Sequence, residues 1–252
     1  MRKLRFLAVA AFIAVFAITA TAFATTTIDP TGSVSVTGGT KKKPKSGSLK
    51  FGFSVTDDAG VQPAPLQKYK IGFEGGRMNL NIMKSCPASK INAADGDDAV
   101  CPKGSKIGSG TLKAKVGAAG DAMANAYDCT ATLTLYAAGK GHASLFVKST
   151  IQTCPAAVHQ AIDMKYSAAN NISSLEFEVP NELRHQIGLD ITVVDTDVTL
   201  PKVTKTVKKG KKKKKVGFLE STGCKDGQRD LVVTFTDEAG AVFPVTKTLG
   251  KC

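Results

Sequence analysis

Apolar and polar residues alternate along much of this chain. Clear examples are residues 49–55, 69–73 and 175–179. Alternation over five to seven residues is typical of a strand with one buried face and one solvated face. Turn residues separate the runs at intervals that predict about ten to twelve strands. The sequence therefore predicts an all-β fold, an antiparallel β-sandwich of immunoglobulin-like or jelly-roll-like type.

Helical periodicity is scarce. The only helix candidates are the short segments 180–186 and 155–161. Two similar turns, at residues 55–60 and 235–240, place acidic residues and a glycine between apolar runs, as a hairpin requires. Their similarity leaves open a division of the sandwich into two related halves.

The first residues have the order of a secretory signal peptide. A basic stretch at residues 1–5 precedes an uncharged apolar run at residues 6–18, and residues 22–24 read Ala-Phe-Ala. This order predicts a signal peptide over residues 1–24 and cleavage before Thr25. A retained membrane anchor is the alternative, but it needs about 20 apolar residues. We expect a secreted protein, extracellular or associated with the cell envelope.

The remaining chain divides by composition into a leader and one domain. Residues 25–47 are rich in Thr, Ser, Gly and Lys and predict a flexible basic leader. Residues 48–252 contain no convincing linker and predict the β-sandwich domain. Within it, residues 208–215 lie between β-like segments and predict a lysine-rich hairpin tip.

The net charge of +13 is concentrated in two lysine tracts. Loss of the signal peptide removes three basic residues and leaves +10. The tracts, at residues 41–45 and 202–215, hold 13 lysines and no acid, so the rest of the protein carries −3. Because the position of a charge decides what it can bind, the body is not expected to behave as a basic protein.

The six cysteines predict a disulfide framework, because their number is even and the expected compartment is oxidising. Two pairs flank hairpins whose turns lie near the midpoint between the cysteines, and elimination leaves the third pair. The expected bridges are Cys86–Cys101, Cys129–Cys154 and Cys224–Cys252.

The stretch from Cys86 to Ile107 repeats the order Cys-Pro…Ser-Lys-Ile. Zinc is disfavoured because the two cysteines are fifteen residues apart with no histidine nearby, and redox chemistry favours C-x-x-C. The repeat therefore predicts one stapled loop, with Ile91 and Ile107 as the apolar residues that return to the core.

An acidic cluster inside this loop is a weak calcium candidate. It consists of Asp95, Asp97 and Asp98. The order of acids, glycine and distant glutamate that defines a helix-loop-helix calcium site is missing. A solvated turn is the main interpretation, and a calcium-stabilised adhesion module is an alternative.

Catalytic motifs are absent from the sequence. There is no G-x-S-x-G, H-E-x-x-H or phosphate-binding glycine loop. His142, His159 and His185 are far apart and share no motif. We expect no catalytic residues, no cofactor and no resident metal. An extracellular hydrolase of glycan or ester bonds is the alternative.

The second lysine tract is the sharpest surface feature. Its candidate polyanion-binding residues are Lys208, Lys209, Lys211, Lys212, Lys213, Lys214 and Lys215. They indicate electrostatic attraction to an anionic cell-wall polymer or a membrane surface. No aromatic residues interleave the lysines, so specific nucleic-acid binding is not expected. The alternative is a solvated loop that aids solubility. No protein partner is indicated.

The chain resembles a set of secreted actinobacterial β-rich proteins of unknown function. The resemblance rests on the doubled Cys-Pro…Ser-Lys-Ile and above all on the C-P-x-G-S-K-I-G-S-G stretch at residues 101–110. The segments at 108–111 and 177–180 and the terminal hairpin at 224–252 extend it over most of residues 48–252. It implies an extracellular or envelope-associated structural or adhesive protein, and supplies no catalytic residues.

Overall fold

The alternating segments form strands of one curved antiparallel sheet. The computed structural model describes residues 26–118, 120–210 and 212–252, so the predicted signal peptide lies outside the described residues. Twelve strands join the main sheet. In spatial order they are β1 (Thr26–Val34), β3 (Leu49–Asp57), β12 (Leu189–Leu200), β6 (Lys106–Gly117), β7 (Tyr127–Gly139), β8 (His142–Lys148), β9 (His159–Ala169), β10 (Ile172–Glu178), β4 (Leu66–Glu74), β16 (Gln228–Asp237) and β17 (Val242–Lys251), with β11 (His185–Gln186) paired to β12.

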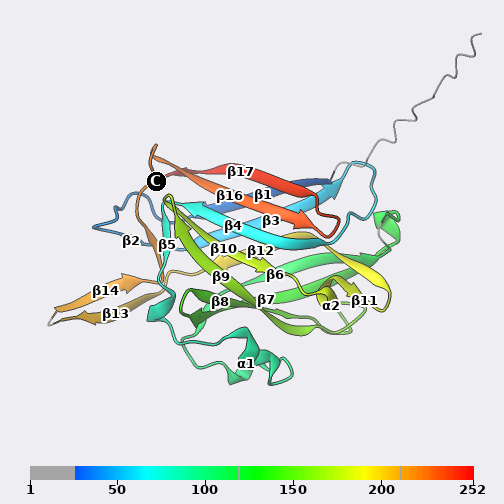
Figure 1. The fold of residues 1–252 in the computed structure, drawn as a ribbon, viewed down its shortest axis with the longest axis horizontal. Coiled ribbons are helices and arrows are strands. Elements are labelled where there is room, and N and C mark those ends of the chain that lie inside the picture. Colours follow the sequence, from blue (N-terminus) through cyan, green and yellow to red (C-terminus); the bar gives the residue numbers. More distant parts are fainter. Residues whose placement is uncertain (1–25, 119, 211) are drawn as a thin grey trace, which may run out of the picture.

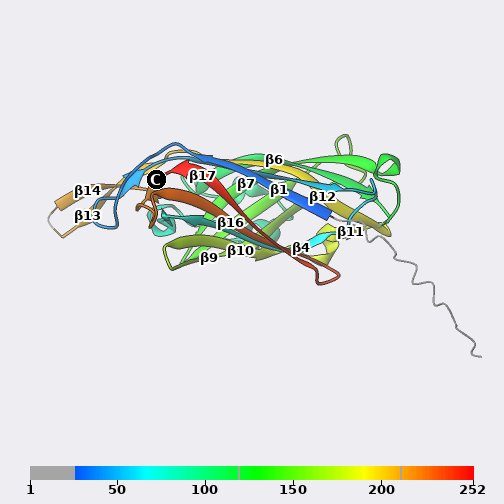
Figure 2. The ribbon, with the colours of Figure 1, turned by 90° about the horizontal axis from the view of Figure 1, so that it is seen from above.

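This sheet folds over on itself into two layers. Figure 2 shows β1, β12, β6 and β7 in one layer and β9, β10, β4 and β16 in the other. The first and last strands of the sheet, β1 and β17, lie side by side (Figure 1). Lys247 on β17 forms an ion pair with Asp29 on β1, with 2.8 Å between Nζ and Oδ1. The antiparallel β-sandwich is therefore confirmed.

The space between the layers is filled by the apolar members of the alternating segments. Phe53, Tyr69 and Phe235 are all buried and come from three different strands. The ring centroids of Phe53 and Phe235 lie 4.9 Å apart, and those of Tyr69 and Phe235 lie 5.5 Å apart. Aromatic contacts across the layers are thus a main part of the interior.

Two smaller sheets lie at one end of the sandwich. The first joins β2 (Lys45–Ser46), β15 (Leu219–Ser221) and β5 (Gly76–Met78). The second is a ribbon of only β13 (Thr204–Lys209) and β14 (Lys212–Gly217). The ribbon confirms the hairpin expected around residues 208–215.

The helical segments are short. They are α1 (Ala88–Asn92), α2 (Asn181–Arg184) and the 3₁₀ turns η1 (Leu80–Ile82), η2 (Asp98–Val100) and η3 (Met123–Asn125). The helix expected at 180–186 is confirmed in α2. The one expected at 155–161 is wrong, because β9 already begins at His159. No helix in the described ranges has the length and apolar character that crossing a bilayer requires.

The prediction of a flexible leader at 25–47 is wrong for its first part. Thr26–Val34 forms β1 and pairs with β3 along its full length. Ile28 and Pro30 alternate inward and are buried. Threonine and glycine surround these few apolar residues, so the composition of the segment is typical of a flexible leader. The alternation of its apolar residues, in contrast, is typical of a strand.

Three disulfides join the cysteines in the expected pairs: Cys86–Cys101, Cys129–Cys154 and Cys224–Cys252. The Cys86–Cys101 loop carries α1 and packs on the outer face of β8 and β9. Ile91 and Phe146 are buried there, in a small cluster separate from the main interior. Ile107 is buried in the main interior. Both isoleucines are thus buried, but in different clusters.

Candidate functional site

The β13–β14 ribbon, residues 204–217, forms a projection that we call the lysine arm. It extends from one end of the sandwich in both views (Figures 1 and 2). Among the strands that the structure describes, β13 and β14 pair only with each other. The register sets Lys208 opposite Lys213 and Lys209 opposite Lys212. Like charges directly opposite one another destabilise a strand pair. Repulsion between the facing lysines therefore lowers the stability of the arm.

No carboxylate neutralises these charges among the described side chains. The exposed lysines of the arm are Lys205, Lys208, Lys212, Lys213, Lys214 and Lys215. None of them is within salt-bridge distance of an acidic side chain in the described part of the chain. Lys208, Lys213 and Lys215 lie on one face of the ribbon by its register, and Lys205, Lys212 and Lys214 on the other. Both faces therefore attract anions.

The base of the arm is held firmly in the body. Phe218, the residue after β14, is fully buried. Its amide donates to the Val203 carbonyl at 2.8 Å, and its carbonyl accepts from the Asn79 amide at 2.7 Å. The arm thus projects from a fixed base.

A buried glutamate strengthens this base. Glu220 is 3% exposed and accepts hydrogen bonds from Arg77 Nη2 at 2.5 Å, Asn79 Nδ2 at 2.9 Å and the Gly217 amide at 3.0 Å. Burial alone would raise the pKa of this carboxyl group. The hydrogen bonds from Arg77, Gly217 and Asn79 and the charge of Arg77 outweigh burial, so the pKa is lowered.

The structure adds a second basic tract to the same end of the molecule. Lys45 lies in β2, which packs next to β14. The loop that carries exposed Lys103 is also close, because Lys205 Nζ lies beside Gly104. Sequence reasoning treated residues 41–45 and 202–215 as separate tracts and did not single out Lys103. Their proximity depends on strand pairing between distant segments, which no local pattern reveals.

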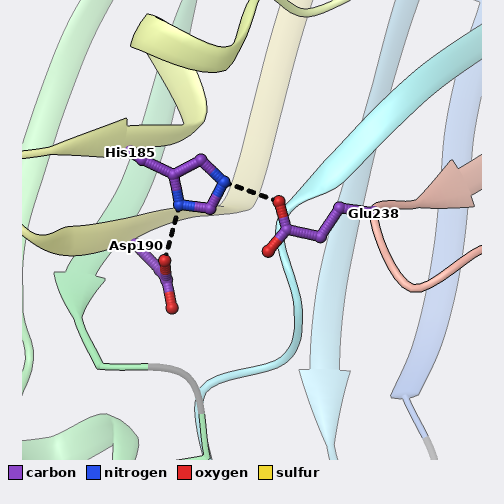
Figure 3. A group of neighbouring side chains, drawn as sticks. All are labelled: His185, Asp190 and Glu238. Carbon is purple, nitrogen blue, oxygen red and sulfur yellow. Dashed lines mark hydrogen bonds and ion pairs between the residues drawn. The ribbon is translucent and has the colours of Figure 1, made fainter.

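The opposite end carries a second polar group, which we call the His185 clasp. It comprises Arg184, His185, Asp190 and Glu238. Figure 3 shows the last three of these residues, with Glu238 coming from the β16–β17 hairpin. His185 Nδ1 lies 2.7 Å from Asp190 Oδ1, and Nε2 lies 2.7 Å from Glu238 Oε2. Arg184 Nη1 donates to the same Glu238 oxygen. The clasp ties α2 and β11 to the β16–β17 hairpin.

A tight turn positions His185 opposite Asp190. These residues pair across the β11–β12 hairpin, whose two-residue turn is Ile187-Gly188. Both turn residues have positive φ, 49° for Ile187 and 76° for Gly188. This backbone conformation is typical of a two-residue hairpin turn whose twist matches that of the flanking strands. Isoleucine rarely adopts a positive φ.

The clasp contains an imidazole and two carboxylates, which are common metal ligands, but its charged groups are not arranged as in a metal site. One atom from each of His185, Asp190 and Glu238 lies within 4.8 Å of the others. However, the cationic guanidinium of Arg184 already bonds the Glu238 oxygen that a metal would need. Both imidazole nitrogens also face carboxylates, whereas activation of a nucleophile requires one nitrogen to face that group. The geometry fits an ion-pair network.

The other histidines are not part of this group. His142 Nδ1 lies 2.8 Å from Asp163 Oδ2 on the outer face of β8 and β9. His159 is exposed at the start of β9. The three histidines of the sequence therefore do not form one site.

The weak calcium candidate is not brought together. Asp95, Asp97 and Asp98 form no common ligand group among the described residues. Asp97 accepts a hydrogen bond from the Ala99 amide at 2.9 Å, and Asp98 accepts one from the Tyr136 hydroxyl at 2.6 Å. The Asp97 carboxylate thus forms a hydrogen bond within the Cys86–Cys101 loop, and the Asp98 carboxylate connects this loop to the sheet.

Comparison with known proteins yields no match: no family model, no curated protein and no solved structure is significantly similar to this chain. The resemblance to secreted actinobacterial proteins stays a prediction.

Proposed function

We propose that this is a secreted, non-catalytic protein of the cell envelope that binds anionic polymers through the lysine arm. The observation that carries the proposal is the like-charge register of an exposed ribbon whose described lysines have no carboxylate within salt-bridge distance in the described ranges. A loop kept only for solubility does not require lysines opposite one another in a paired ribbon. An anionic partner would relieve the repulsion on binding.

The length of the arm favours a linear polymer. Each strand has six residues, or about 20 Å at ~3.3 Å per residue. The body carries a slight negative charge, and the Debye length in physiological salt is about 8 Å. Lysines near the tip are therefore largely screened from the body and present their charge outward.

Export is part of the same proposal. The predicted signal peptide and the three disulfides are both appropriate for an oxidising compartment. Wall polymers with phosphate or carboxylate groups are the anions that an envelope offers there. N-terminal sequencing of the exported protein should find Thr25 as the first residue.

The test is binding of a purified glycerol-phosphate polymer across a salt series. A flexible polymer along one face meets about three lysines, so log K should fall with log[salt] with a slope of roughly −2. Replacing residues 211–215 by glutamine should abolish measurable binding at 50 mM salt, since most of the charge near the tip is lost.

A matched control removes five lysines from the outer face of the sheet. These are Lys68, Lys70, Lys113, Lys148 and Lys165. The control changes net charge equally and should retain most of the affinity. Equal loss in both variants, or no loss in the arm variant, would contradict the proposal. Stronger binding to phosphatidylglycerol vesicles than to the polymer would identify a membrane surface instead.

A further inference from the structure

A cavity of about 140 Å³ lies between the two layers of the sandwich. Its walls are formed mainly by apolar side chains from eight strands of the main sheet, and no charged residue lines it in the described ranges. Representative wall residues are Phe51, Leu133, Leu145, Leu175 and Val198. Its volume is close to that of an engineered apolar cavity of ~150 Å³ that stays dry and binds benzene.

The residues that line the cavity are spread along the length of the strands. On β7 alone its lining runs from Cys129 to Leu135, which is six residue intervals or about 20 Å. It reaches Leu200 toward the arm end and Leu183 of α2 at the clasp end. A small volume over this length fits a single unbranched chain better than a fused ring system.

Several wall residues remain partly accessible although they point inward. Leu145, Val193 and Val198 are only half-buried, and all three line the cavity. Protein interiors are normally packed as tightly as organic crystals. Inward apolar side chains that remain half-buried therefore indicate unfilled space that is available to a ligand.

One polar side chain in the wall lacks a partner. Thr196 is 8% exposed and lines the cavity, and its Oγ1 makes no hydrogen bond among the described residues. Buried hydroxyl groups are nearly always bonded. The hydroxyl-bearing side chain of Tyr69, 4% exposed, also lines the cavity. Burial raises the Tyr69 pKa, so this hydroxyl remains a donor.

We propose that the cavity binds one unbranched alkyl chain that carries a single neutral hydrogen-bonding group, as in a fatty alcohol or a monoacyl lipid. The chain fills the apolar slot, and the polar group bonds the Thr196 hydroxyl. A charged headgroup inside the cavity is disfavoured because no wall residue would compensate it. This site is separate from the lysine arm and does not depend on the proposed function.

The first test uses neutral probes, so that attraction to the lysines cannot contribute. Hexan-1-ol, octan-1-ol and decan-1-ol are titrated into the full mature protein by calorimetry, with benzene as an apolar reference. Affinity should rise about fourfold for each added methylene while the slot has room. It should not change between 50 and 500 mM salt. Absence of binding at the solubility limit of all three alcohols would overturn the proposal.

The second test uses variants. Val198→Phe places a ring in the cavity and should weaken octan-1-ol binding more than tenfold, whereas Thr199→Phe, on the opposite face of β12, should leave it unchanged. Thr196→Val should weaken octan-1-ol binding about two- to tenfold, through loss of one hydrogen bond, and leave benzene binding unaltered.

Each outcome of the variant test has a defined meaning. If Val198→Phe fails to fold, Thr196→Val still tests whether the alcohol binds at the Thr196 hydroxyl, since that change in side-chain volume is small. Unchanged octan-1-ol binding by Thr196→Val would refute the role of the hydroxyl. Equal loss in Val198→Phe and Thr199→Phe would refute binding in the cavity. The glutamine variant of residues 211–215 should bind the alcohols normally, so the proposed function and this inference fail independently.

Discussion

Replacing Glu220 by glutamine tests whether the base of the lysine arm depends on one buried carboxylate. Oε2 of Glu220 accepts from Arg77 and Asn79, while Oε1 accepts from the Gly217 amide. Glutamine has one acceptor oxygen and one donor nitrogen. Whichever way the amide is oriented, at least one donor of the site meets another donor.

The expected cost follows from these contacts. If the nitrogen faces Gly217, the buried Gly217 amide loses its Glu220 acceptor, at about 1–3 kcal/mol. If it faces Arg77, a hydrogen bond between charged groups worth about 1.5–3 kcal/mol is lost. Because the Arg77 side chain is 41% exposed, water compensates part of that loss. We expect Glu220→Gln to lower the free energy of unfolding by about 1–3 kcal/mol, a sizeable part of the ~5–15 kcal/mol of an ordinary domain.

The assay is urea unfolding followed by far-UV circular dichroism, since the chain has no tryptophan. With a slope of about 2 kcal/mol per molar urea, the midpoint should fall by about 0.5–1.5 M. The pH dependence supplies an internal check. The pKa of Glu220 is lowered from 4.5 in the folded state, so its contribution is present above that pH and is lost on acidification. The difference between wild type and variant should shrink from pH 6 to pH 3.5.

Glu176→Gln is the matched control. Its side chain is 57% exposed, and its oxygen lies 3.7 Å from Lys70 Nζ, a distance typical of a weak surface pair. It should cost less than about 0.5 kcal/mol. A Glu220→Gln cost as small as that of the control, or a difference that grows on acidification, would refute the account of the arm base.

Three further predictions concern the rest of the fold. Changing Cys129 and Cys154 to serine should cost about 3.5 kcal/mol of unfolding free energy, because the bridge closes a separation of 25 residues; a loss under 1 kcal/mol by denaturant titration would contradict this. The raised pKa of Tyr69 predicts that absorbance at 295 nm reports fewer than four ionised tyrosines at pH 11 until guanidinium unfolds the protein. A double-mutant cycle of His185→Gln and Glu238→Gln should give a coupling of about 1 kcal/mol, and additivity would exclude the clasp as an energetic unit.

The features that sequence predicted well are those set by neighbours in the chain. Alternation marks which residues of a strand face inward, and the turn between two strands places their ends together. The Cys129–Cys154 pairing and the β13–β14 hairpin both follow from a turn near the midpoint of a segment. Both features are set by residues close together in the chain and do not depend on the order of the other strands in the sheet.

The missed features all depend on the order of strands in space. Strand β12 lies between β3 and β6, and both of these strands precede it in the chain by more than 70 residues. Alternation specifies a buried face but not which strand lies alongside. The partner of His185 in the clasp, Glu238, is 53 residues away and resembles any exposed acid in a turn. The cavity, too, appears only when the two layers are placed together.

One cross-strand pair can distinguish a lysine arm that binds polyanions from a lysine arm that only increases solubility. Lys208 and Lys213 are directly opposite, and a two-stranded ribbon without further support is only marginally stable in water. Selection for stability alone would place opposite charges there. The wild-type pair therefore implies either a benefit from binding or a tolerance of weak pairing in a solvated loop.

Lys213→Glu distinguishes these alternatives, because it moves stability and binding in opposite directions. The new ion pair with Lys208 should stabilise the ribbon by about 0.5–1 kcal/mol and slow hydrogen exchange of the paired arm amides about two- to fivefold. If the arm binds polyanions, affinity for the glycerol-phosphate polymer should fall several-fold at 50 mM salt. Lys165→Glu, with the same charge change on the outer face of β9, should alter neither measurement. Slower exchange with unchanged polymer affinity would show that the lysines serve only solubility, because the arm would then be better ordered with no cost to any binding.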